Sequence, residues 1–105
     1  MYKESKIMTI EKTTNGSELA IAITGRLDTS TAPELESSLK QSIDGVTKLV
    51  FDFSNLEYVS SAGLRVLLSA QKIMNKQGEM VLRNVPEPVM EVLEVTSFTD
   101  ILTIE

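Results

Sequence analysis

Apolar and polar residues alternate near the start of the chain, as they do in half-buried β-strands. In residues 18–24, leucine and isoleucine fall on one side, and alanine and threonine fall on the other. Residues 7–13 form a preceding candidate strand, and Asn15-Gly16 between the two is a strong turn signal. We expect Gly25 to end the second strand. The pattern therefore predicts a β-hairpin as the first structural unit.

Two later segments have the apolar spacing of helices. The first begins at Pro33, which suits a first helical turn, and runs to about residue 43. The second begins at Ser60-Ser61 and is closed by Gln77-Gly78. Its predicted apolar face consists of Leu64, Leu67, Leu68, Ala70, Ile73 and Met74. Its predicted solvent stripe consists of Arg65, Ser69, Lys72 and Lys76. Extended back by four residues, this stripe predicts an exposed Ser61 hydroxyl at the start of the helix.

Residues 48–53 are apolar at nearly every position. Such a run is typical of a central strand covered on both faces. A strand of this kind is usually parallel to its neighbour and is reached through a crossover helix. A short polar loop is then expected to lead to Ser60.

The last quarter of the chain completes the predicted order of elements. Residues 79–83 form the next strand, Pro86 opens a last helix that ends near Val95, and residues 101–104 form a short terminal strand. The order ββαβαβαβ predicts an α/β fold, with a mixed sheet of four to five strands packed against helices. We expect one domain over residues 1–105, because this length suits a single compact domain.

The composition excludes several kinds of chemistry. The chain has no His and no Cys, so it lacks the usual general base of a serine or cysteine triad and the commonest metal ligands. We therefore expect no catalytic residues, no metal and no cofactor. It has no Trp and only five aromatic residues, which makes a base-stacking surface for nucleic acid improbable.

The net charge of −5 resides in the last segment of the chain. Residues 84–105 contain five acidic side chains and no basic one, whereas acidic and basic residues cancel before them. An acidic face disfavours DNA and permits a basic protein partner, although an acidic helix is most often simply solvated. No apolar run approaches the roughly 20 residues that span a bilayer, and the first residues lack a secretory pattern. We therefore expect a cytoplasmic protein that does not insert into membranes.

Ser60 and Ser61 carry the main functional alternatives. Serine at a helix start is a good N-cap, which alone explains many such residues. The same helix end stabilises negative charge, so a phosphate on a hydroxyl there is also favoured. From spacing alone, both readings stay open.

Three segments together resemble one protein family. Val50-Phe-Asp-Phe-Ser-Asn-Leu-Glu-Tyr-Val-Ser-Ser-Ala-Gly-Leu-Arg-Val-Leu is similar to the signature of the bacterial anti-sigma-factor antagonists, the STAS domains. Ile23-Thr-Gly-Arg-Leu-Asp-Thr-Ser-Thr-Ala-Pro is similar to that family's loop and helix start, and Gly78-Glu-Met-Val-Leu also fits. The resemblance covers nearly the whole chain in the expected order.

The resemblance implies a phosphorylation switch. The serine ahead of the small-Gly-Leu step is Ser61, which a serine kinase that is also the anti-sigma factor would phosphorylate; Ser60 is the second choice. The unmodified protein would bind that kinase and release a sigma factor, and a serine phosphatase would restore the unmodified form. The resemblance implies a monomer when free, and a partner-binding surface made of Asp28, Thr29, Ser60, Ser61, Gly63 and Arg65.

Two alternatives remain at this point. STAS-like domains also serve transporters and lipid-trafficking complexes, where the same surface would dock a partner without phosphorylation. For Arg65, the charge could neutralise a phosphate on Ser61, four residues earlier, or could simply be solvated.

Overall fold

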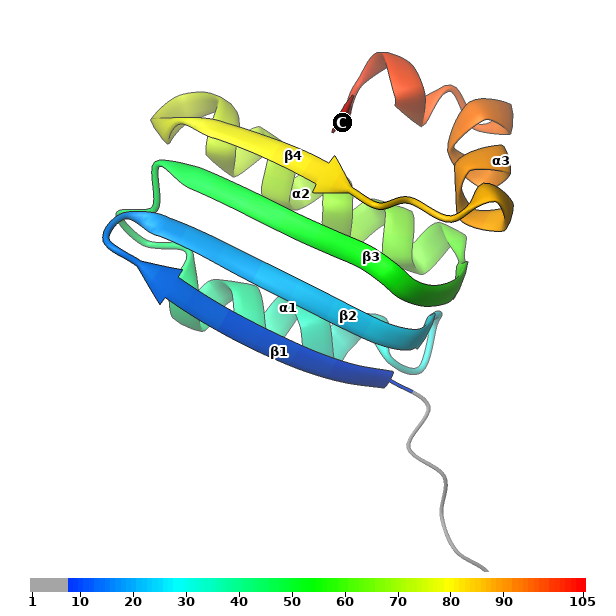
Figure 1. The fold of residues 1–105 in the computed structure, drawn as a ribbon, viewed down its shortest axis with the longest axis horizontal. Coiled ribbons are helices and arrows are strands. Elements are labelled where there is room, and N and C mark those ends of the chain that lie inside the picture. The colour runs from blue at the N-terminus through cyan, green and yellow to red at the C-terminus, as the bar shows by residue number, and fades with distance from the viewer. Residues whose placement is uncertain (1–7) are drawn as a thin grey trace, which may run out of the picture.

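Five strands form one mixed sheet in the order β1-β2-β3-β4-β5 in the computed structural model, which describes residues 8–105 (Figure 1). β1 (Met8–Asn15) pairs antiparallel with β2 (Glu18–Leu27), and β3 (Lys48–Val59), β4 (Glu79–Arg83) and β5 (Thr103–Ile104) continue the sheet in parallel. The α/β fold and the order ββαβαβαβ are thus confirmed.

Helices connect the parallel strands. α1 (Ala32–Ser42) joins β2 to β3, α2 (Ser61–Gln77) joins β3 to β4, and α3 (Glu87–Val95), followed by a short 3₁₀ turn at Phe98–Asp100, joins β4 to β5. In Figure 1, α1 and α2 lie behind the sheet and α3 lies beyond the end of β4. Right-handed crossovers that advance in one direction along a sheet place their helices on the same face, which explains this arrangement.

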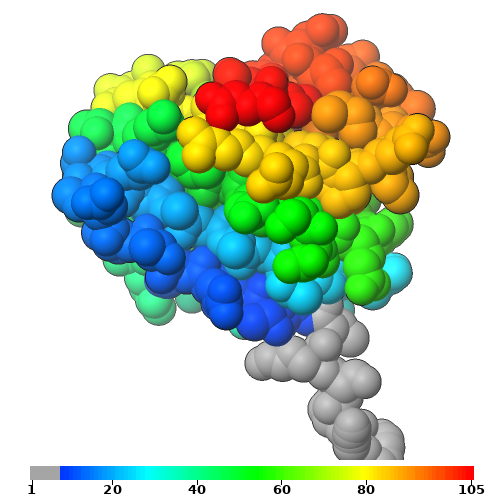
Figure 2. Space-filling view, viewed as in Figure 1, coloured from blue at the N-terminus to red at the C-terminus, as the bar shows by residue number. Residues whose placement is uncertain are grey.

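The core lies between the sheet and the helices. Phe51 and Phe53 of β3 are fully buried on the helix side, with their ring centroids 5.7 Å apart. Val50, on the opposite side of β3, is also only 4% exposed. Figure 2 shows, however, that no helix covers this front face of the sheet. The prediction that β3 is covered on both faces is therefore wrong: the close cross-strand neighbours Ala20 and Val81, aligned with Val50, shield it instead.

Both central strands extend beyond their predicted ends. β2 does not stop at Gly25 but continues to Leu27, and β3 runs through the predicted polar loop to Val59. Register shifts near residues 23 and 25 of β2 accommodate the extra residues of β3, and Gly25 adopts a φ of +101° there. These irregularities break the alternation of apolar residues, which is why the strand ends were predicted too early.

The ends of the chain differ in smaller ways. Of the predicted first strand, Ile7 lies outside the described residues, and β1 extends to Asn15. Of the predicted last strand, only Thr103–Ile104 pairs with β4, because the Ile101 and Leu102 N–H groups still donate to the Phe98 carbonyl oxygen at the end of the 3₁₀ turn.

α2 is held firmly at its C-terminal end. The Gln77 side-chain amide donates to the carbonyl oxygens of Ile43 and Val46, at 2.8 and 2.7 Å. Gly78 follows, and a Cβ at this position would lie only 1.9 Å from the Thr47 carbonyl oxygen. The predicted helix stop at Gln77-Gly78 is confirmed, and the close backbone approach gives its physical reason.

Candidate functional site

The site lies where β2 and β3 end and their helices begin. In Figure 1 the β2–α1 loop and the start of α2 are neighbours at one end of the sheet. The Ser60 backbone N–H donates to the Leu27 carbonyl oxygen at 2.9 Å, which joins the two connections directly. Open α/β sheets commonly bind partners and ligands beyond the carboxyl ends of their parallel strands.

Ser60 is the N-cap of α2. Its backbone is extended (φ −100°, ψ 177°), and its hydroxyl oxygen accepts a long hydrogen bond of 3.4 Å from the Gly63 N–H. Its carbonyl oxygen accepts the first helical hydrogen bond from the Leu64 N–H, at 2.9 Å. Ser60 therefore carries out the capping role that the sequence assigned to the serine pair.

Ser61 is the first residue of α2, and its side chain is exposed. Within residues 8–105 its hydroxyl forms no hydrogen bond. The predicted solvent stripe that begins at Ser61 is confirmed, because Arg65, Ser69, Lys72 and Lys76 are all exposed. Of the predicted apolar face, Leu64, Leu67, Ala70 and Met74 are buried, Leu68 is half-buried, and Ile73 is 41% exposed beside α1.

Gly63 belongs to the site through packing. It is buried, and an added Cβ would lie 2.7 Å from Leu27 Cγ, 2.9 Å from Val59 Cγ2 and 3.0 Å from the Leu27 carbonyl oxygen. Only glycine lets the first turn of α2 approach the ends of β2 and β3 this closely. Gly63 thus seats Ser61 on the sheet but is not itself on the surface.

Asp28 organises the β2–α1 loop. Its Oδ1 accepts from the Ser30 hydroxyl at 2.9 Å, from the Ser30 N–H at 3.0 Å and from the Thr31 N–H at 3.2 Å. These hydrogen bonds hold the pKa of Asp28 below its usual value, and the one from the Ser30 hydroxyl contributes most. The carboxylate is also 3.6 Å from Arg26 Nε. Asp28 thus remains ionised and gives the loop a fixed shape.

Thr31 is a contributor that the sequence did not single out. It is buried, and its hydroxyl donates to the Arg26 carbonyl oxygen and accepts from the Asp28 N–H, both at 2.8 Å. Its place just before Ala32-Pro33 was the available signal, since a threonine there often serves a helix start. Its side chain makes no cap bond to α1, however, and closes the loop instead.

A hollow of about 300 Å³ lies beside the site, between α1 and α2. Its lining consists of Thr29, Ala32, Pro33, Glu36, Ala62, Arg65, Val66 and Ser69. The structure therefore brings Thr29 and Arg65 together at one hollow, whereas the side chains of Asp28, Ser60 and Ser61 lie outside its lining. A small apolar hollow continues along the two helices to Ile43 and Ile73.

The site presents an exposed serine hydroxyl. The sequence has no histidine or cysteine, and residues 8–105 contain no group of three acidic side chains placed to hold a metal ion. None of the helices in this part of the chain could cross a membrane. The arrangement is suited to being bound or modified by another protein: an exposed serine, a structured loop and a shallow hollow on one surface.

Comparison with known proteins identifies the family of the chain. The STAS domain model matches residues 9–105. A protein of Bordetella bronchiseptica that carries the name anti-sigma factor antagonist BtrV is 38% identical over 88 residues, covering 82% of this chain and 76% of that protein. The anti-sigma-B factor antagonist of Staphylococcus aureus is 28% identical over 97 residues, covering 90% of both.

Solved structures agree on the fold. An anti-sigma factor antagonist from Mycobacterium paratuberculosis superimposes with a TM-score of 0.84 at 21% identity, covering 92% of this chain and 84% of that one. The Bacillus cell fate determinant SpoIIAA in its phosphorylated form gives a TM-score of 0.73 at 16% identity, covering 92% and 91%. The chain belongs to the STAS domain family.

Proposed function

We propose that this protein is an anti-sigma factor antagonist. In this proposal it is a regulatory binding protein without enzymatic activity, residues 1–105 form one STAS domain, and it acts in the cytoplasm. The unmodified form binds an anti-sigma factor that is also a serine kinase and thereby frees a sigma factor. Phosphorylation of Ser61 ends this binding, and a serine phosphatase restores it.

One observation carries the choice of Ser61. Its hydroxyl is exposed and unbonded within the described residues, whereas the neighbouring Ser60 hydroxyl already accepts a hydrogen bond as the N-cap. A kinase must seat the acceptor hydroxyl in its own active site, so the exposed serine is the better substrate. The names of the two relatives support the role of the whole protein.

The position also explains how a phosphate can switch binding without unfolding the domain. A phosphate adds about −1.5 to −2 charge. At the N-terminus of α2 this charge is favoured by about 0.3–1 kcal/mol when exposed. At an interface, in contrast, a desolvated and unpaired phosphate costs several kcal/mol. Because 1.4 kcal/mol is a factor of ten in affinity, the switch can act at the interface alone.

Incubation with ATP and the anti-sigma kinases of the same organism tests the proposal. We expect mass spectrometry to locate one phosphate on Ser61, and Ser61→Ala to abolish it while Ser60→Ala leaves it in place. Pull-down of the kinase by the unmodified protein, and its loss on phosphorylation, complete the test. Kinase binding without any modification of either serine would contradict the switch and favour a docking role in a transport or lipid-trafficking system.

A further inference from the structure

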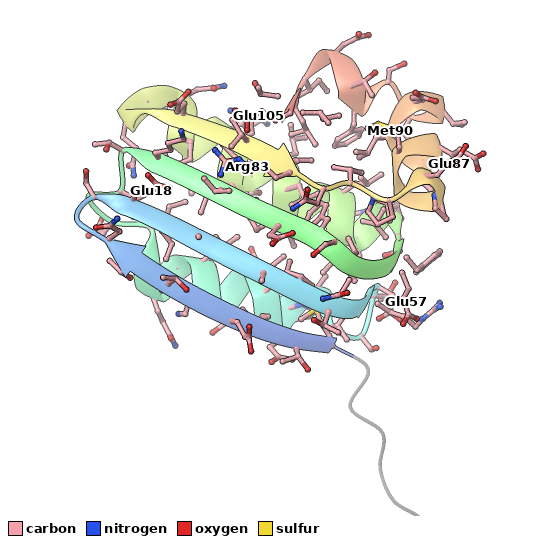
Figure 3. All side chains as sticks on the ribbon, in the orientation of Figure 1. Glu18, Glu57, Arg83, Glu87, Met90 and Glu105 are labelled. Atoms are coloured by element: carbon pink, nitrogen blue, oxygen red, sulfur yellow. The ribbon has the colours of Figure 1, made fainter. Side chains whose placement is uncertain are left out.

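Of the arginines, Arg65 alone forms no ion pair within residues 8–105. Arg26 lies 3.6 Å from Asp28 and 4.4 Å from the centre of the Tyr58 ring. Arg83 contacts Glu105 at 2.7 Å, as Figure 3 shows on the front face of the sheet. Arg65 forms no ion pair with any residue from 8 to 105. Its guanidinium is therefore available to a new anion.

The spacing along α2 puts Ser61 within reach of the Arg65 side chain. The two residues are four apart, which is about one helical turn and a rise of about 6 Å. They share the exposed stripe, and long helical side chains lean toward the N-terminus of their helix. An arginine at this spacing can reach the oxygens of a phosphate on Ser61 from the next turn of the helix.

No acidic side chain competes on the first turn of α2. α1 and α3 each carry a glutamate in the first turn, Glu34 and Glu87, whereas α2 carries none. Glu36 of α1 lines the same hollow as Arg65 but belongs to another helix and forms its ion pair with Lys40. A phosphate on Ser61 would thus be the strongest negative charge within one turn of Arg65.

We propose that Arg65 is the intramolecular counter-ion of a phosphate on Ser61. This inference rests on the proposed phosphorylation at that residue. The pairing forms charge-assisted hydrogen bonds from the guanidinium to the phosphate oxygens, in which no covalent bond changes. Modification then alters the surface twice: it adds the phosphate, and it draws the Arg65 cation away from the hollow between α1 and α2.

The titration of the phosphate itself measures this pairing. Phosphoserine can be incorporated at position 61 during translation, which makes the test independent of any kinase, and ³¹P NMR follows its second ionisation, which lies near pH 6 when unpaired. A cation hydrogen-bonded to the phosphate, with its charge at about 4 Å, lowers that pKa by about 0.7 in a water-like medium. We therefore expect Arg65→Ala to raise the pKa of the phosphate by about 0.7, and the difference to shrink in high salt.

Two controls isolate the contact. Lys72→Ala removes the same charge from the same stripe, but Lys72 lies 11 residues from Ser61, or about 16 Å along the helix. We expect it to leave the pKa of the phosphate unchanged. Phosphoserine at position 60, on the cap and off the stripe, should respond less to Arg65→Ala than phosphoserine at position 61.

Equal titrations for the Arg65→Ala and Lys72→Ala proteins would overturn the inference, and circular dichroism would show that both variants are folded. That outcome would leave the proposed switch standing, because the kinase assay tests it separately. An absence of phosphorylation by the kinase would in turn leave the titration result valid as a property of the helix.

Discussion

Replacing Gly63 with alanine tests how the start of α2 is seated on the sheet. At an exposed helical position this change is stabilising, by up to about 1 kcal/mol, because alanine is the better helix former. At position 63, the added Cβ would lie 2.7 Å from Leu27 Cγ and 2.9 Å from Val59 Cγ2, where an ordinary carbon contact is about 3.5–4.0 Å. Leu27 and Val59 are 0% and 2% exposed, so neither can move aside into solvent.

The expected result is a net loss of stability. Overpacking of a buried site costs about 1–3 kcal/mol, and the helix propensity of alanine offsets up to about 1 kcal/mol of it. We therefore expect Gly63→Ala to lower the free energy of unfolding by about 1–2 kcal/mol, and Tm by about 5–15 °C for a domain of this size. Urea unfolding followed by far-ultraviolet circular dichroism measures this directly, since the chain has no tryptophan to report it by fluorescence.

A matched pair on the same helix supplies the reference. Lys72 is exposed in the middle of α2, so the difference between Lys72→Gly and Lys72→Ala gives the glycine-to-alanine effect without packing. If Gly63→Ala stabilised the protein as much as this difference, the argument from close contact would be refuted.

Four further substitutions test other contacts of the site and the fold. Ser60→Ala should lower the free energy of unfolding by about 0.5–1 kcal/mol through loss of the cap, whereas Ser61→Ala should change it by less than about 0.5 kcal/mol in the same urea titration; a larger effect at Ser61 would reverse their assigned roles. Gln77→Ala should cost about 1–2 kcal/mol, because two carbonyl oxygens lose their donor, and a thermal melt indistinguishable from that of the unmodified protein would contradict this. Hydrogen bonds from the Ser54 N–H, which contributes most, and from the Asn84 amide hold the pKa of Asp52 below its usual 3.8. The ionised carboxylate therefore stabilises the fold above pH 3.8, and this stabilisation is lost as the pH falls below that value. Asp52→Asn should therefore flatten the decline in stability below pH 3.8, and an equally steep decline would exclude this source.

The site was predictable where it follows from regular periodicity. The spacing of Arg65, Ser69, Lys72 and Lys76 placed Ser61 on the outside of a helix, and the structure agrees, because exposure along an α-helix depends only on rotation about one axis. The strand ends were not predictable in this way. Extra residues in β3 opposite β2 shift the register, and a bulge depends on a partner strand that is distant in sequence.

The contacts that shape the site were also beyond the sequence. The hydrogen bond from the Ser60 N–H to the Leu27 carbonyl oxygen joins groups that come together only when β2 and β3 pair. The burial of Val50 on a face without a helix has the same origin, since its shielding comes from the two strands beside it. The Thr31 hydroxyl bonds within its own loop, but the fold of that loop decides that it closes the loop and does not cap α1. Local pattern gives each element its inward side, but it does not say which neighbour will lie there.

The anchoring of α2 at both ends has a consequence for signalling. Gly63 fixes its first turn against Leu27 and Val59, and Gly78 and Gln77 fix its last turn against the segment between α1 and β3. Because both ends are held, α2 can neither slide nor rotate without breaking buried packing at one end or the other. We therefore expect phosphorylation to change the surface at Ser61 without changing the conformation of the domain. A partner that distinguishes the two forms must then contact Ser61 directly.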